Sequence, residues 1–253
     1  MRLLDRIRQQ GDTLFRFRSF VPLALLPVLL LAFPESERID QGLGEAFDHL
    51  FFYTCLALSY AGLAIRWFTV GFVPAGTSGR NTHGQRAHEL NTTGAYSVVR
   101  NPLYVGNFVA MLGVVLFIKV WWLAVIFALA YTLYIERVVA TEEAYLRGRF
   151  GAAYDSWAAR TPAFLPRFAN WQRPAQGFSL RTVLRREYAG VLAVPLAYLF
   201  AELVMDVLIE GEPLSKWAAT DSAWLVVTAA AAAVYMVLRT LKKHTSVLRV
   251  AGR

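Results

Sequence analysis

The sequence of 253 residues has few of the features that mark several common protein classes. It holds one cysteine, Cys55, so no disulfide can form within the chain. It contains no Gly-x-Gly-x-x-Gly fingerprint and no alternation of strands with helices, which argues against a soluble Rossmann-type domain. It shows no internal repeat, which argues against a transporter built from two matching halves.

Apolar residues, by contrast, are in excess and come in long blocks. They make up 56% of the chain, whereas soluble domains average about 45–50%. A spanning helix needs about 20 mostly apolar residues, and the last two blocks reach that length, whereas the first is short. We therefore predict an all-α fold, a polytopic membrane helix bundle with about six transmembrane helices. The six blocks are Phe20–Phe33, Leu50–Ile65, Leu103–Ile118, Val120–Ile135, Tyr188–Ile209 and Ala223–Leu238.

The distribution of positive charge predicts the orientation of this bundle. The net charge is +8, and all but Arg38, Lys119 and Lys216 of the 26 lysines and arginines fall on one side if both termini are cytosolic. This asymmetry follows the positive-inside rule, so the charge requires no nucleic-acid partner. We predict an integral, multi-pass protein of a bacterial inner (plasma) membrane with N-in/C-in topology. Arginines precede the first block as in a signal peptide, but no small-residue cleavage pattern follows, so we expect an uncleaved anchor.

Two inner segments, 66–101 and 136–186, are long, whereas the outer connections at 34–48, 119 and 210–221 are short. In the segment 136–158, apolar residues recur at helical spacing, which predicts an amphipathic helix on the cytosolic face. Its polar face carries Glu142 and Glu143. Solvated charge is the simpler explanation for these two acids when they are taken alone.

The other polar motif is Thr93–Gly106, TGAYSVVRNPLYVG, which contains Arg100, Asn101 and Pro102. Proline suits the first turn of a helix, so the triplet alone predicts a helix start with an arginine at the membrane surface. Tyr104 and Asn107 then share one helix face. A polar stripe at this depth is costly unless it faces water, protein or ligand.

Together, the two motifs resemble the signature of the integral-membrane methyltransferases that include isoprenylcysteine carboxyl methyltransferase and the phospholipid N-methyltransferases. That family shows Thr-Gly-Pro-Tyr and Arg-His-Pro-x-Tyr, then Glu-Glu-x-x-Leu, Phe-Gly-x-x-Tyr and a proline-containing tail. The second block appears here as EEAYLRGRFGAAYDSWAARTPAFLP, from Glu142 to Pro166, and the resemblance covers roughly residues 50–168. Two positions depart from it: Ala95 replaces proline, and Asn101 replaces histidine, so it cannot act as a base near neutral pH.

The resemblance implies an enzyme that binds S-adenosylmethionine. Glutamates accept from its ammonium or hydroxyl groups, arginine pairs with a carboxylate or phosphate, and tyrosine rings favour a cation. The resemblance assigns Arg100, Glu142 and Glu143 as catalytic residues. The predicted cofactor-binding residues are Gly94, Tyr96, Arg100, Asn101, Pro102, Tyr104, Glu142, Glu143 and Tyr154.

The resemblance covers only the middle of the chain, so we expect three parts. We predict an N-terminal anchor helix and outer loop over residues 1–49, a methyltransferase core with the cofactor pocket over residues 50–168, and an appended C-terminal transmembrane hairpin over residues 169–253.

The expected partner is a lipid or lipidated substrate, methylated at the cytosolic face on an isoprenylcysteine-like carboxylate or on a headgroup phosphate or amine. The missing base favours an oxyanion acceptor, because an amine must first lose a proton. Arg80 and Asn81 in the loop TSGRN are candidate substrate-binding residues for a phosphate. A solvated loop that contacts anionic headgroups explains them equally well.

The competing hypothesis is a non-catalytic membrane protein that retains the fold as a partner or assembly factor, and Asn101 favours it.

We expect no metal site, because His83 and His88 lack a third ligand at suitable spacing. Glu202 and Asp206 lie four residues apart in the fifth block, where we expect a polar patch at the outer interface.

Overall fold

The computed structural model describes residues 3–17, 24, 26–40, 45–74, 87–220 and 222–252, and no strand occurs among them. Four described helices are long and apolar enough to cross a membrane: Phe47–Gly71, Trp121–Phe150, Leu180–Ile209 and Ser222–His244. Leu26–Ser36 and Pro102–Phe117 form shorter apolar helices. The predicted all-α membrane bundle is therefore confirmed.

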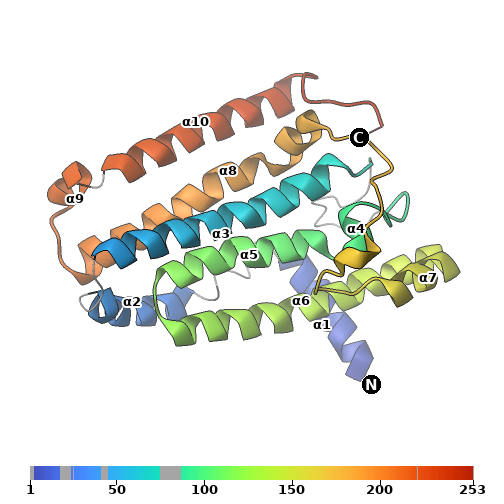
Figure 1. The fold of residues 1–253 in the computed structure, drawn as a ribbon, viewed down its shortest axis with the longest axis horizontal. Coiled ribbons are helices and arrows are strands. Elements are labelled where there is room, and N and C mark those ends of the chain that lie inside the picture. Colours follow the sequence, from blue (N-terminus) through green and yellow to red (C-terminus); the bar gives the residue numbers. More distant parts are fainter. Residues whose placement is uncertain are drawn as a thin grey trace.

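The long helices lie side by side, and the short helix α4 and helix α7 gather at one end of them (Figure 1). We call this the motif end, because the Thr93–Gly106 motif lies there. The elements in chain order are α1 (Leu3–Phe17), α2 (Leu26–Asp40), α3 (Glu45–Gly71), α4 (Ala95–Val98), α5 (Pro102–Phe117), α6 (Trp121–Phe150), α7 (Ala152–Arg160), the 3-10 turn η2 (Phe168–Asn170), α8 (Leu180–Glu202), the π-helical η3 (Leu203–Ile209), α9 (Leu214–Thr220) and α10 (Ser222–His244).

Small residues bring α3 and α5 into very close contact. A Cβ atom added at Gly62 would lie 2.3 Å from the backbone nitrogen of Ala110, and one at Gly113 would lie 2.2 Å from Oγ of Ser59. Ser59 also donates to the carbonyl of Ala110 at 2.9 Å. Close approach through small residues is the usual means by which helices associate in a membrane. Consequently α3 supports the whole length of the helix that begins with the Arg-Asn-Pro motif.

A second contact region lies between α1 and α6. Phe15 is buried there against Ile135, Val138 and Val139, and partly buried Tyr104 and Phe164 pack on this cluster. The sequence pattern did not lead us to predict α1. It packs on α6 beside Tyr104 of the first turn of α5.

The amphipathic helix predicted over 136–158 was not a separate element. Helix α6 runs without a break from Trp121 to Phe150, and Gly151, at φ 52°, separates it from α7. Its 30 residues span about 45 Å at 1.5 Å per residue, more than the roughly 30 Å of a bilayer core. The acidic pair is therefore on the extension of a spanning helix beyond the apolar layer.

The N-terminal prediction also needs correction. Helix α2 continues through Pro34 to Asp40, so the first part of the predicted outer loop 34–48 is helical. The predicted block Phe20–Phe33 begins before α2 does. Residues 18–23 and 25, which include the start of that block, lie outside the described residues. The tight turn at Lys119 is confirmed, with φ 63°. The outer connection 210–221 contains α9.

Acidic side chains meet tryptophans at the end of the bundle opposite the motif end. The indole nitrogen of Trp224 donates to Glu202 at 3.2 Å, and that of Trp217 donates to Asp206 at 3.0 Å. Tryptophan is enriched at membrane interfaces because its ring is apolar and its N–H is polar. These contacts agree with a polar patch at this end.

Candidate functional site

The side chain of Arg100 joins the two motifs. Its Nε donates to Oε1 of Glu143 at 2.8 Å, and its Nη1 donates to the carbonyls of Ala158 at 2.9 Å and Thr161 at 2.7 Å. Its backbone N–H donates to the carbonyl of Pro162 at 2.8 Å. Residues 43 to 62 positions apart in sequence are thereby held in one place.

Tyr104 connects the first turn of α5 to the other acid. Its hydroxyl donates to Oε1 of Glu142 at 3.0 Å, and its backbone carbonyl accepts from the hydroxyl of Tyr131 on α6 at 2.7 Å. Neighbouring residues on a helix point about 100° apart. Glu142 and Glu143 therefore bind different partners, Tyr104 and Arg100, and both face the motif.

Asn101 precedes α5 and makes no side-chain cap hydrogen bond to it. Its Nδ2 donates instead to the carbonyl of Ala163 at 3.1 Å, and Pro102 follows as the buried first helical residue. The amide thus links α5 to the segment after α7. It supplies hydrogen bonds and cannot take up a proton near neutral pH.

Tyr154 has the most unusual environment in the site. Its side chain is buried, and its hydroxyl has no hydrogen-bond partner of good geometry among the described residues. Its ring packs edge-on to Trp157 with centroids 5.7 Å apart. Burial raises the pKa of Tyr154, and the negative charge of nearby Glu143, together with a hydrogen bond of poor geometry to it, raises it further. The hydroxyl therefore stays protonated, and a buried hydroxyl without a partner of good geometry is a candidate for contact with a ligand.

Residues 161–175, the covering segment, lie across the start of the first motif. The N–H of Gly94 donates to the carbonyl of Gln172 at 3.0 Å, and the N–H of Arg167 donates to the carbonyl of Val98 at 2.9 Å. Oγ of Ser97 accepts from the N–H of Gln172 at 2.9 Å. Gly94 has φ 60° and ψ −133°, a conformation that glycine adopts readily.

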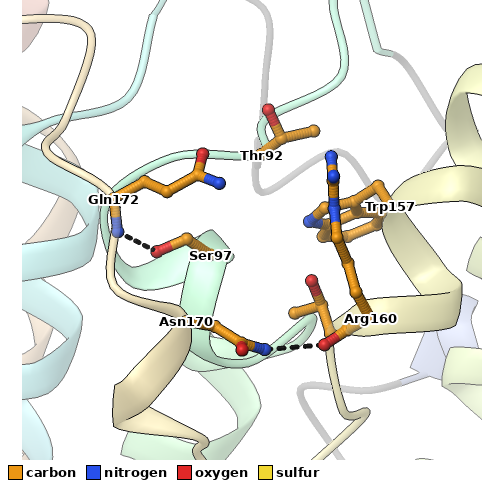
Figure 2. A pocket seen from close by; sticks show the side chains of 7 residues that line it. Thr92, Ser97, Trp157, Arg160, Asn170 and Gln172 are labelled. Atoms are coloured by element: carbon orange, nitrogen blue, oxygen red, sulfur yellow. Dashed lines mark hydrogen bonds between the residues drawn. The ribbon is translucent and has the colours of Figure 1, made fainter.

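A small cleft of about 80 Å³ lies between the covering segment, α4 and α7. Figure 2 shows Arg160 extended beside Trp157, with Gln172 on the opposite wall. Ligand pockets for molecules of cofactor size measure about 300–1,000 Å³. The cleft is therefore too small for a molecule of that size, and none of the predicted cofactor-binding residues lines it. The lining residues are Thr92, Ser97, Trp157, Arg160, Thr161, Asn170 and Gln172.

The structure gathers the predicted cofactor-binding residues at the motif end, whereas their roles stay predictions. The backbone carbonyl of Tyr96 accepts from the indole of Trp157 at 3.0 Å.

The predicted substrate residues Arg80 and Asn81 lie outside the described residues, as does His83. His88 is exposed. Within the described part of the chain, no three His, Cys, Asp or Glu residues are placed to hold a metal ion.

Several polar residues near the site were not predicted from the sequence. The hydroxyl of Tyr131 donates to the backbone carbonyl of Tyr104. Arg66 on α3 binds Asn107 on α5 and Glu187 on α8. Arg66 and Glu187 each directly border an apolar block. A charged residue next to an apolar block was the sequence feature that could have indicated a buried ion pair.

The fold and site define a helical membrane protein with a polar site where its helices leave the apolar layer. Residues 53–153, about two fifths of the chain, match the model of the phospholipid methyltransferase family. No solved structure matches the chain with significance.

Three curated relatives match the chain over limited regions. Nickel-cobalt-cadmium resistance protein NccN of Alcaligenes xylosoxydans xylosoxydans is 43% identical over 86 residues, 34% of this chain and 40% of the relative. Cobalt-zinc-cadmium resistance protein CzcN of Cupriavidus metallidurans is 36% identical over 86 residues, 34% of this chain and 39% of the relative. Protein-S-isoprenylcysteine O-methyltransferase of Schizosaccharomyces pombe is 34% identical over 79 residues, 31% of this chain and 34% of the relative. The match thus spans about two fifths or less of each relative's length.

Proposed function

We propose that this protein transfers a methyl group from S-adenosylmethionine to a lipid or lipidated acceptor at the cytosolic face of a bacterial inner membrane. The observation that carries the proposal is the direct bonding of the two motifs, with Arg100 on Glu143 and Tyr104 on Glu142. The match of residues 53–153 to the phospholipid methyltransferase family supports it. So does the similarity to an isoprenylcysteine O-methyltransferase.

The chemistry of the site residues fits this cofactor. Glu142 and Glu143 suit its ammonium and ribose hydroxyls, and Arg100 suits its carboxylate. The buried hydroxyl of Tyr154, which has no partner of good geometry within the described chain, offers one more contact. When bound, the cofactor supplies an electrophilic methyl group on a sulfonium.

The protein's own part is to align the acceptor and to exclude water, as in-line displacement requires. The site offers no base at position 101, because an asparagine amide does not take up a proton near neutral pH, and its Nδ2 donates to the carbonyl of Ala163. We therefore favour an acceptor that is already anionic, either an isoprenylcysteine-like carboxylate or a headgroup phosphate. An amine acceptor would have to lose its proton elsewhere.

Calorimetry with S-adenosylmethionine on detergent-purified protein tests cofactor binding. We expect saturable binding that Arg100→Ala and Glu142→Ala weaken by about tenfold or more, which corresponds to about 1.4 kcal/mol. Arg147→Ala is the matched control, because Arg147 lies on the same helix as Glu142 and its ion pair with Asp155 of α7 is exposed. Absence of binding in detergent and in lipid nanodiscs would show that the protein does not use this cofactor.

The acceptor is identified by a second experiment. Membranes that contain the protein are incubated with methyl-labelled cofactor, and lipids are separated from proteins. Label in a base-labile ester on a lipidated protein indicates a carboxylate, whereas label in the lipid fraction indicates a headgroup. Membranes with the Arg100→Ala variant supply the background.

The second candidate function is a non-catalytic role in resistance to divalent transition metals. The names of two relatives, both metal resistance proteins, favour it. Growth of a deletion strain on nickel, cobalt and cadmium, complemented with wild type or Glu142→Gln, separates the two candidates. If the variant restores resistance but lacks methyl transfer, the protein acts as a partner. If it restores neither, methyl transfer underlies the resistance.

A further inference from the structure

Arg66 and Glu187 form a buried ion pair between α3 and the C-terminal hairpin. Nε and Nη2 of Arg66 donate to Oε2 and Oε1 of Glu187 at 2.8 and 2.9 Å. The side chains are 12% and 4% exposed. Arg66 lies five residues before Gly71 at the end of α3, and Glu187 lies seven residues after Leu180 at the start of α8. At about 1.5 Å per residue, both lie roughly 7–11 Å inside their helices.

The same guanidinium also holds the first turn of α5. Nη1 of Arg66 donates to Oδ1 of Asn107 at 2.7 Å and to the carbonyl of Leu103 at 3.3 Å. Its stem crosses α5 at Gly106, where an added Cβ atom would lie 2.7 Å from Cγ of Arg66. A glycine at position 106 therefore lets the arginine lie directly on the helix.

This turn carries the residues of the candidate site. Asn101 and Pro102 begin it, and Tyr104 points from it to Glu142. From the other side, Tyr131 on α6 binds the carbonyl of Tyr104. The turn is thus held between Arg66 and Tyr131. Its placement decides where the motif side chains lie.

We propose that Arg66 and Glu187 are positioning residues through which the C-terminal hairpin fixes the first turn of α5 and so the geometry of the site. Two parallel hydrogen bonds to Glu187 fix the plane of the guanidinium, and this aims Nη1 at α5. Glu187 lies outside the family match at 53–153, so a residue of the appended hairpin sets the geometry of the family segment. The effect on catalysis rests on the proposed methyl transfer. The effect on α5 does not.

The test compares Glu187→Gln and Arg66→Lys with Tyr198→Phe in lipid nanodiscs. Tyr198 is fully buried, and its hydroxyl lies 3.1 Å from Oγ of Ser59, so the control breaks a bond between the same two helices, α3 and α8, away from the site. Hydrogen exchange is measured for the backbone amides within residues 101–107, all except Pro102, which has no N–H. Methyl transfer is measured alongside, with kcat and KM separated.

We expect amide exchange in residues 101–107 to become at least tenfold faster in both site variants and to stay unchanged in Tyr198→Phe. We expect kcat to fall at least tenfold in the site variants, because a displacement of about 1 Å can cost a hundredfold in rate. Lysine keeps the charge of Arg66 but cannot reach Glu187 and α5 together, so its defect should match that of Glu187→Gln.

Two results would overturn the positioning role. One is equal exchange of residues 101–107 in all variants and wild type. The other is an equal change in Tyr198→Phe, which would indicate general loosening of the bundle. If wild type shows no methyl transfer but the exchange pattern appears, the proposed function fails while the positioning of α5 stands.

Discussion

Arg100 is the residue on which the arrangement of the site depends most directly. Its guanidinium satisfies one carboxylate and two backbone carbonyls, and these acceptors lie on α6, α7 and the residue that follows α7. A planar fork with fixed donor directions can do this, whereas a single ammonium group cannot. Arg100 thus has a structural role in addition to the cofactor contact that we propose.

Asn101 stands where the family signature has histidine, and it is one of the two departures from that signature. Its amide is bound to the carbonyl of Ala163. That contact explains how asparagine is accommodated there. An amide is no base near neutral pH, and this is why we favour an anionic acceptor.

At the scale of single residues, Tyr154→Phe separates stability from ligand binding. The hydroxyl is buried and has no partner of good geometry within the described chain. Its removal should leave the free energy of unfolding unchanged or raise it by up to about 1 kcal/mol. Affinity for S-adenosylmethionine should fall about tenfold. Thermal unfolding and calorimetry on the same preparation measure the two effects.

The control for this change is Thr228→Val on α10, where another buried hydroxyl has no partner of good geometry among the residues that the structure describes. It lies outside the site, so stability should respond as in Tyr154→Phe while cofactor affinity stays at the wild-type level. A clear loss of stability in Tyr154→Phe would mean that the hydroxyl has a structural partner, and the assignment of Tyr154 to the cofactor would then fail.

At the scale of elements, the contact between α3 and α5 sets the position of the first motif. Glycines at 62, 106 and 113 let the two backbones approach so closely that any added Cβ atom would overlap the neighbouring helix. Helix α5 is only 16 residues long. Close packing on the 27-residue α3 stabilises it in the bundle.

Gly106→Ala tests this contact. The added methyl would lie 2.7 Å from Cγ of Arg66 and 2.8 Å from the carbonyl oxygen of Gly62. We expect a loss of about 1–3 kcal/mol of stability from overpacking, measured by thermal unfolding in detergent. Gly148→Ala in α6, with nothing within 4 Å, should instead stabilise the protein by up to about 1 kcal/mol. Equal shifts in the two variants would contradict the close contact.

The length of α6 explains how two distant motifs come together. The helix crosses the apolar layer and continues beyond it, and this extension carries Glu142 and Glu143 alongside the start of α5. The turn at Gly151 sends the chain back through α7. The covering segment then bonds to residues 94–101.

At the scale of the whole molecule, the C-terminal hairpin is bonded into the bundle. Glu187 pairs with Arg66 where both helices border their apolar blocks, and the hydroxyl of Tyr198 lies 3.1 Å from Oγ of Ser59. Buried charged groups are costly without a partner. The hairpin is therefore part of the structure that supports the site.

The orientation of the molecule is tested by cysteine labelling in intact cells. Lys216 and Arg173 are exposed at opposite ends of the bundle, and Cys55 is buried. The charge asymmetry predicts that Lys216→Cys reacts with a membrane-impermeant maleimide in intact cells. Arg173→Cys should react only after permeabilisation. The reverse pattern would place the motif end outside the cytosol.

Much of the fold follows from patterns that are local in sequence. The apolar blocks predicted the long helices because spanning segments must satisfy their own backbone and bury their own surface in lipid. Helix α1 was missed because its apolar residues are too few to form a block. The break at Gly151 was missed because the apolar spacing continues across it, and periodicity does not show a change in helix direction.

The sequence by itself determined that the chain is a helical membrane protein and that two motifs, Thr93–Gly106 and Glu142–Pro166, lie at one end of it. Hydropathy and motif spacing are properties of short stretches, so no other information was needed. Only the tertiary structure decided that Arg100 binds Glu143, that Tyr104 binds Glu142, and that Glu187 supports both through Arg66. Such pairings depend on helix packing and on the length of α6, which bring side chains from distant parts of the chain within hydrogen-bonding distance.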